Sequence, residues 1–113
     1  MHATASGSVS WAVQAGGTGQ DDSEGICSDG SGGAYVTGDF EQTASFGTTS
    51  LTSYGQTDAF VMHVTGSGTI DWALQAGGLS SDGARSVASD GWGGAFVTGW
   101  FEGTATFGSV ELT

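Results

Sequence analysis

Residues 90–108 read DGWGGAFVTGWFEGTATFG, and residues 29–47 read DGSGGAYVTGDFEQTASFG. Sliding the chain against itself by 61 positions aligns residues 1–52 with residues 62–113 without a gap, and 29 of these 52 pairs are identical. Self-similarity at a long period marks repeat proteins, in which neighbouring units bury the faces that one unit leaves bare. The sequence therefore predicts a repeated structural unit.

The segments within one repeat are typical of β-strands. They are short, contain β-branched or aromatic residues, and are separated by glycine-rich turns of the kind that hairpins need. No sustained 3.6-residue period appears, and glycine interrupts every candidate helix. We therefore expect four main antiparallel strands with a small extra hairpin between the second and third. The four strands are residues 25–29, 33–40, 58–65 and 69–78, and the hairpin is residues 43–47 with 49–53.

The candidate strands also indicate how the sheets pack. Several lack clean alternation, for example AFVMHV at residues 59–64, which favours sheets covered on both faces. A four-stranded sheet packed on both faces by copies of itself is a β-propeller blade. A stacked β-solenoid is the main alternative, but a 61-residue period is long for one solenoid coil. The predicted fold is all-β, with four-stranded propeller blades whose first strand, residues 24–29, lies next to the axis.

Several separated motifs occur in a fixed order along the chain. They are Asp-x-x-Gly-x-Ala-Tyr/Phe-Val-Thr-Gly-x-Phe, then Ala-x-Phe-Gly, Leu-Thr-Ser, Asp-Ala-Phe-Val and Trp-Ala-x-Gln-x-Gly-Gly. In this order they resemble the SBBP-type bacterial β-propeller repeat, over essentially the whole chain in two partial passes. The chain departs from the family where Gly32-Gly33 and Gly93-Gly94 stand in place of a usual Gly-Asn pair, although both pairs can supply positive φ. The resemblance implies a non-enzymatic propeller, often part of a secreted or cell-surface bacterial protein, with mostly undefined ligands.

The repeats are out of phase with the expected blades. Residues 1–17 correspond to the last two strands of a blade, residues 24–78 to a complete blade, and residues 85–113 to the first two strands; no second copy of residues 53–61 follows. About two blades per chain cannot close a ring, and they leave strand edges and apolar faces bare. We therefore expect a homo-oligomer of three or four chains, with six or eight blades, in which each chain completes a blade with the next. An excised or engineered propeller fragment would have the same organisation.

Charge restricts the classes of partner. The chain has 12 acidic residues and one basic residue, a formal charge of −11, which argues against nucleic acid and anionic membranes as partners. No apolar run approaches the length of a transmembrane span. Cys27 is the only cysteine and Ala88 is its repeat counterpart, which indicates a small packing residue and leaves the redox compartment and localisation open.

Nothing in the sequence predicts catalysis. His2 and His63 occupy the same repeat position, on a strand where packing or a hydrogen bond to a neighbouring blade is the simpler role, and no serine-hydrolase, P-loop or zinc-protease motif is present. We expect no enzymatic activity. Asp29 and Asp90 begin glycine-rich turns, and turn stabilisation explains them better than calcium binding, which needs several clustered oxygen ligands.

Other acidic residues precede the first strand of each blade. Asp21, Asp22 and Asp82 are expected on one rim of the ring, where an acidic rim can bind divalent cations weakly, and calcium is the only candidate cofactor. Glu24 and Arg85 share one repeat position and are expected to alternate around the channel mouth. The simpler alternative is a solvated pair that contributes under about 1 kcal/mol.

Four tryptophans complete the candidate residues. Trp11 and Trp72 belong to the repeat and are expected to pack between blades. Trp92 and Trp100 replace Ser31 and Asp39 of the other copy and can stack on sugar rings, so glycans are a possible partner class. The sequence thus favours a self-assembling scaffold or interaction module. A carbohydrate-binding lectin and a weak cation-binding scaffold are the alternatives.

Overall fold

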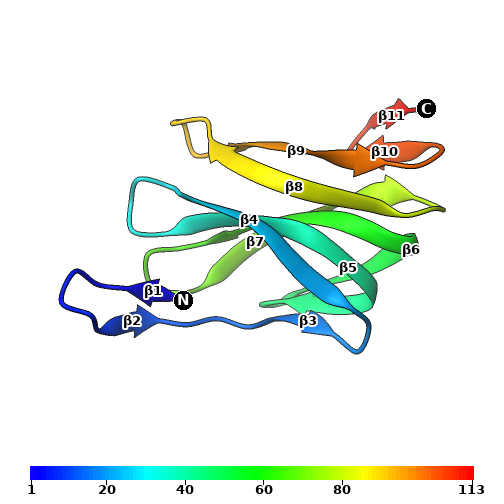
Figure 1. Cartoon of the computed structure of the whole chain (residues 1–113). Coiled ribbons are helices and arrows are strands. Elements are labelled where there is room, and N and C mark those ends of the chain that lie inside the picture. Colours follow the sequence, from blue (N-terminus) through cyan, green and yellow to red (C-terminus); the bar gives the residue numbers. More distant parts are fainter.

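The structure is a computed structural model that describes residues 1–113 and contains eleven β-strands and no helix. All strand ladders are antiparallel, which confirms the all-β expectation. Three layers lie one above another in Figure 1: an N-terminal layer, a central sheet and a C-terminal layer. With no helix present, none is long and apolar enough to cross a membrane.

The central sheet contains the strands β4 to β7 in chain order. Their bounds are β4 (Asp21–Ser28), β5 (Ala34–Phe46), β6 (Thr49–Val64) and β7 (Ile70–Gly78). The four expected strands all occur, although the first begins at Asp21, three to four residues before its expected start at residue 24 or 25. The turn after β4 depends on glycine, since Gly30 and Gly32 have φ values of 81° and 90°.

The small hairpin expected between the second and third strands is not a separate element. Residues 43–46 and 49–52 are instead the far ends of β5 and β6, which pair from Thr43↔Thr52 to Phe46↔Thr49. A bulge between Glu41 and Thr43 separates this pairing from the main ladder, and Gln42 within it has a φ of 59°. The bulge bends the hairpin while its hydrogen bonding continues.

The N-terminal layer consists of β1 (His2–Ala3), β2 (Val9–Trp11) and β3 (Ala15–Gly17), and the C-terminal layer of β8 (Asp82–Ser89), β9 (Ala95–Phe101), β10 (Ala105–Phe107) and β11 (Val110–Leu112). β1 pairs with β2, β8 with β9 and β10 with β11. The β8–β9 pair lies above the central sheet in Figure 1.

A short ladder joins the N-terminal layer to the central sheet, and an equivalent ladder joins the central sheet to the C-terminal layer. β3 pairs with the end of β5 through Ala15↔Phe46, and the end of β7 pairs with β10 through the equivalent Ala76↔Phe107. The backbones approach so closely that a Cβ on Gly78 would lie 2.0 Å from a backbone oxygen of Thr104. This contact explains the second glycine of each QAGG motif, because a Cβ on Gly17 would equally lie 2.0 Å from a backbone oxygen of Thr43.

The main core lies between the central sheet and the N-terminal layer. Its buried side chains come from the central sheet, and Trp11, Val13 and Ala15 pack against them from the N-terminal layer. Phe40, Phe46 and Phe60 form a contiguous aromatic group within it. Apolar burial of this kind is the main source of stability in such a sheet.

Candidate functional site

The most unusual surface of the molecule is the open edge of β9, residues 95–101. β9 repeats the start of β5, but it pairs only with β8, whereas β5 is paired on both sides. Tyr35 of β5 is 2% exposed, while its counterpart Phe96 is 69% exposed. The difference arises because β6 covers β5 and no strand covers β9.

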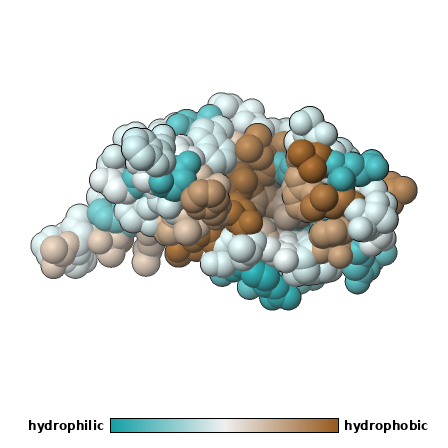
Figure 2. Space-filling view, turned by 90° about the horizontal axis from the view of Figure 1, so that it is seen from above, coloured by the Kyte–Doolittle hydropathy of each residue, from teal (hydrophilic) through white to brown (hydrophobic).

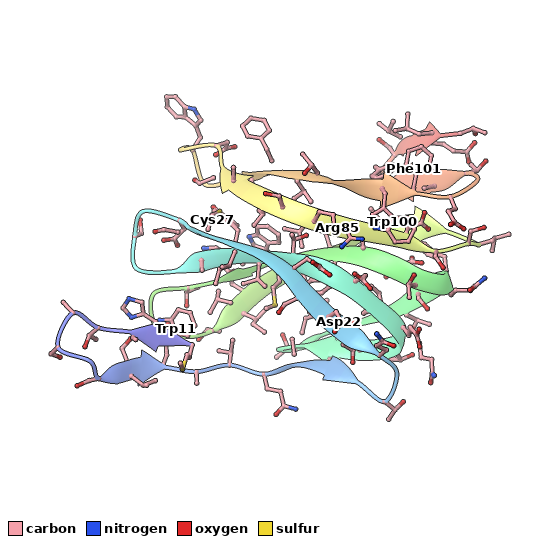
Figure 3. The ribbon with its side chains drawn as sticks, in the orientation of Figure 1. Trp11, Asp22, Cys27, Arg85, Trp100 and Phe101 are labelled. Carbon is pink, nitrogen blue, oxygen red and sulfur yellow. The ribbon has the colours of Figure 1, made fainter.

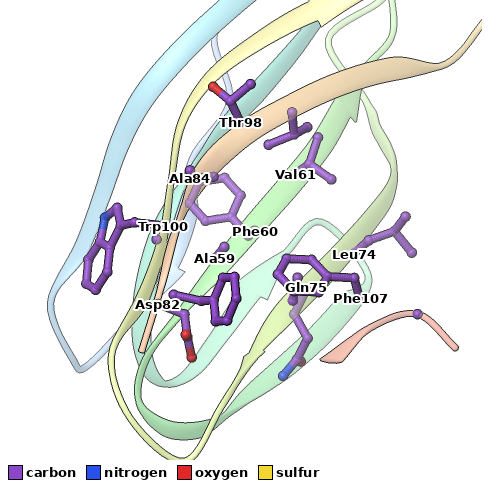
Figure 4. A pocket seen from close by; sticks show the side chains of 16 residues that line it. Ala59, Phe60, Val61, Leu74, Gln75, Asp82, Ala84, Thr98, Trp100 and Phe107 are labelled. Carbon is purple, nitrogen blue, oxygen red and sulfur yellow. The ribbon is translucent and has the colours of Figure 1, made fainter. Parts of the chain in front are cut away.

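A cavity of about 580 Å³ lies beside this edge, between the C-terminal layer and β6 and β7 of the central sheet (Figure 4). Its apolar lining includes Phe60, Leu74, Phe101 and Phe107. Figure 2 shows hydrophobic residues gathered on the face seen from above. Exposed apolar surface beside an unpaired strand is typical of a protein interaction site.

The N-terminal layer presents an equally open edge. β1 pairs only with β2, and Met1 and Ala3 are exposed, although their counterparts Met62 and Val64 are buried in the central sheet. His2 Nδ1 lies 2.6 Å from Ser10 Oγ, but His2 Nε2 has no hydrogen-bond partner. A strand with one unpaired edge is therefore exposed at each of two opposite sides of the molecule (Figure 1).

His63, the counterpart of His2, is held between two carboxylates. Its Nε2 lies 2.9 Å from Asp29 Oδ2 and its Nδ1 lies 2.7 Å from Asp71 Oδ1. Burial acts to lower the pKa of His63, but the hydrogen bonds to Asp29 and Asp71 outweigh it and raise the pKa above its usual value. The hydrogen bond from His63 and that from the Ser31 N–H lower the pKa of Asp29. The cluster ties the first turn of the central sheet to β6 and β7.

Asp29 and Asp90 also organise their turns. Asp29 Oδ1 accepts hydrogen bonds from the backbone N–H groups of Ser31 and Gly33, at 2.7 and 2.9 Å. Asp90 Oδ1 accepts the equivalent bonds from Trp92 and Gly94. The second oxygen of Asp90 has no partner, because the histidine that faces Asp29 has no counterpart beside Asp90 within this chain.

The carboxylates considered for cation binding do not converge. Asp21 and Asp82 lie in different layers, and each accepts a hydrogen bond from the backbone N–H of the glycine four residues earlier. Asp82 also accepts one from the Glu102 N–H, and Asp22 accepts one from the side chain of Gln20. No group of three or more His, Cys, Asp or Glu side chains is placed to hold a metal ion.

Glu24 and Arg85 lie on β4 and β8, which face each other. The Arg85 Nη1 to Glu24 Oε1 distance is 3.6 Å, and both side chains are exposed. Burial, followed by the negative charges of Asp22 and Glu24, raises the pKa of Asp39 nearby. In Figure 3, Arg85 of β8 lies beside β4, and Asp22 lies farther along β4. The pair is consistent with a solvated contact of small energy.

The tryptophans are placed in three different surroundings. Trp11 and Trp72 stack on His2 and His63 at centroid distances of 5.8 and 5.9 Å, and Trp11 also packs against the core between the N-terminal layer and the central sheet. Trp92 is 92% exposed in the turn before β9, and Trp100 lies at the other end of that strand, on the cavity. Trp92 and Trp100 therefore do not share one ligand site.

Asp58 was not singled out by the sequence. It is fully buried on β6, and Oδ2 accepts hydrogen bonds from the Tyr54 N–H and the Gln75 side chain while Oδ1 has no partner. Burial raises its pKa. The Asp58–Gln75 and Asp29–His63 contacts link residues 17 and 34 positions apart, so no local motif reveals them.

The fold and its open edges define a class: an all-β repeat protein with an open strand edge in its N-terminal and its C-terminal layer. No family model, curated protein or solved structure matches the chain.

Proposed function

We propose that this chain is a non-enzymatic, self-assembling propeller scaffold, in which the C-terminal layer of one copy and the N-terminal layer of the next complete one four-stranded blade. The observation that carries the proposal is the contrast between β9 and the start of β5, which are similar in sequence but differ in whether a second strand pairs with them. The resemblance to SBBP-type repeats supports the same architecture.

The central sheet supplies the template for the contact. Within it, β5 pairs with the end of β6 through Ala34↔Val64, Tyr35↔His63 and Val36↔Met62. The repeat counterparts of these β5 residues, 61 positions later, lie on β9, and the counterparts of the β6 residues, 61 positions earlier, lie at β1. The same pairing therefore places β9 of one copy against β1 of the next. The expected pairs between copies are Ala95↔Ala3, Phe96↔His2 and Val97↔Met1. Phe96 would lie beside His2 on one face of the completed sheet, and Met1, which is also exposed in the single chain, would lie beside Val97 on the other face.

The polar groups at this contact are complementary. In the central sheet, Asp29 Oδ2 and His63 Nε2 lie 2.9 Å apart. Their counterparts are Asp90 Oδ2 and His2 Nε2, which have no partner in the single chain. The proposed register brings these two atoms together, and a carboxylate facing an imidazole N–H is a favourable charge-assisted hydrogen bond.

The contact is heterologous, because the surface used at one end of the chain differs from the surface used at the other. A heterologous contact closes into a ring when the rotation per subunit divides the circle. Three or four copies would give six or eight blades, since each copy contributes about two. The Glu24 and Arg85 positions would then alternate near the axis.

Engineered disulfides test the register directly. In a Cys27→Ala background, Ala95→Cys and Ala3→Cys place two thiols at directly opposed positions of the proposed ladder, where Cβ atoms lie about 4.5–5.5 Å apart. Mild oxidation should give covalent oligomers that end at the trimer or tetramer on non-reducing gels.

The matched control moves the second cysteine from Ala3 to Thr4, which turns it to the other face of the strand. This pair should cross-link poorly. Equal cross-linking of both pairs, or no oligomer beyond a dimer from the Ala95/Ala3 pair, would rule out the proposed register.

A further inference from the structure

Three phenylalanines form a closed group in the central sheet. Phe40 meets Phe46 edge to face, with ring centroids 5.7 Å apart and an interplanar angle of 82°. Phe60 of β6 completes the group at 4.9 Å from Phe46 and 6.5 Å from Phe40. All three are buried.

The C-terminal layer has the same arrangement with one ring missing. Phe101 and Phe107, the counterparts of Phe40 and Phe46, meet edge to face at 5.8 Å and 77°. Phe101 and Phe107 are 36% and 39% exposed and line the cavity of about 580 Å³. No residue of the chain corresponds to Phe60 here, and Figure 4 shows Phe107 and Leu74 at the open cavity. The two rings are held in place for a third that the chain does not supply.

The backbone beside this cavity is also unpaired. Residues 98–101 of β9 correspond to residues 37–40 of β5, which pair with Val61, Phe60, Ala59 and Asp58 in that order. In β9 the same backbone edge has no strand beside it. An unpaired edge next to a side-chain pocket is the arrangement by which proteins bind an extended peptide as an added strand.

We propose that the edge of residues 98–101 and its cavity bind an extended peptide strand of the pattern Asp-Ala-Phe-Val, with the phenylalanine side chain packed on Phe101, Phe107 and Leu74. The strand lies antiparallel to β9 and contributes the ring that Phe60 contributes in the central sheet. This site is continuous with the edge at residues 95–97 that the proposed assembly gives to β1, and the two segments do not overlap. The site does not depend on assembly, because its template lies within one chain.

The aspartate of the pattern carries its own hydrogen-bond partner. In the central sheet Asp58 Oδ2 accepts one hydrogen bond from the Tyr54 N–H at 3.1 Å, in the turn that precedes the strand, and one from the Gln75 side chain at 3.2 Å. A peptide that begins at the counterpart of residue 53 therefore brings the aspartate together with the backbone donor of the turn. A shorter peptide would leave the carboxylate unpaired in an apolar site, which is unfavourable.

Binding of a labelled peptide tests the site. The peptide SYGQTDAFV, which is residues 53–61 of this chain, is titrated with the full chain and followed by fluorescence anisotropy. Replacing its phenylalanine by alanine should weaken binding by about ten- to one-hundredfold, because burial of that ring is lost. Phe107→Ala in the protein should also weaken binding, whereas Trp92→Ala, in the exposed turn away from the cavity, should leave it unchanged.

A fusion of the peptide to the chain tests the same site if the free peptide binds too weakly to measure. The same nine residues are joined directly after Thr113, where the equivalent segment follows Thr52 in the first repeat; tethering raises the effective concentration of the strand. The fusion should unfold at a higher temperature than a fusion carrying alanine in place of the phenylalanine. Equal melting of the two fusions, together with equal or absent binding of the two peptides, would overturn the site. The outcome is separate from the native mass, which tests assembly.

Discussion

His63 is the residue whose protonation matters most for the central sheet. Both of its ring nitrogens face carboxylate oxygens, on Asp29 and Asp71, and a carboxylate can only accept a hydrogen bond. Both nitrogens must therefore carry a proton, and the imidazole is charged when the two contacts are satisfied. Tyr35 and Trp72, which complete its surroundings, pack on the ring.

Stability should consequently depend on pH. Because the folded-state pKa of His63 is raised above its ordinary value of 6.5, its contribution is fully present below about pH 6.5 and is lost as the pH rises through the folded-state value. Asp29 acts on the acid side. Because its folded-state pKa is lowered, its contribution to stability is present above the ordinary pKa of 3.8 and is lost as the pH falls through the lower folded-state value. Thermal unfolding measured from pH 3.8 to about pH 9 should show a midpoint temperature that declines on the alkaline side of about pH 6.5.

The first repeat provides the matched variant. Ser10 stands where the second repeat has Asp71, and a hydroxyl can donate a hydrogen bond to a neutral imidazole. Asp71→Ser should therefore flatten the alkaline decline. A decline of the same size in this variant would contradict the assigned role of the two carboxylates.

At the scale of the elements, the two copies of the repeat differ in what covers them. Phe46 at the end of β5 is buried, while its counterpart Phe107 on β10 is partly exposed beside the cavity. Phe46→Ala should lower the free energy of unfolding by about 3 kcal/mol or more. Phe107→Ala should lower it by roughly 1 kcal/mol, because much of that ring remains in water. Urea unfolding of both variants checks the difference, and equal losses would mean that β10 is as well covered as β5.

The strands and turns were predictable because their signals are local. Glycines at positive φ, such as Gly30 and Gly32, and β-branched or aromatic segments between them mark each hairpin. The continuous hairpin of β5 and β6 and the ladders that join the layers were not predictable. Their pairing, for example Ala15↔Phe46, connects distant residues through backbone atoms, and a glycine at the close approach, such as Gly17, does not identify the partner strand.

The candidate site was partly readable from the repeat. Comparing the two copies identifies edges that one copy covers and the other leaves bare. The contacts of His63 and Asp58 were missed because they cross strands that lie far apart in sequence. The missing third ring of the Phe101–Phe107 pair also required coordinates, because only these show the geometry shared with Phe40 and Phe46.

At the scale of the whole molecule, the two open edges are different and complementary. β9 and the turn before it present apolar side chains and the free Asp90 oxygen, and the N-terminal edge presents Met1 and the free nitrogen of His2. A copy that uses one surface exposes the other. In the proposed assembly, association would continue until a ring closes, and the size of that ring would report the rotation between successive sheets.

The native mass in solution, measured by native mass spectrometry and light scattering over a range of concentrations, reports whether the copies close into a ring. We predict one dominant species of three or four times the 11.2 kDa of the chain. A folded monomer at every concentration, or an open-ended series of sizes, would contradict the closed ring.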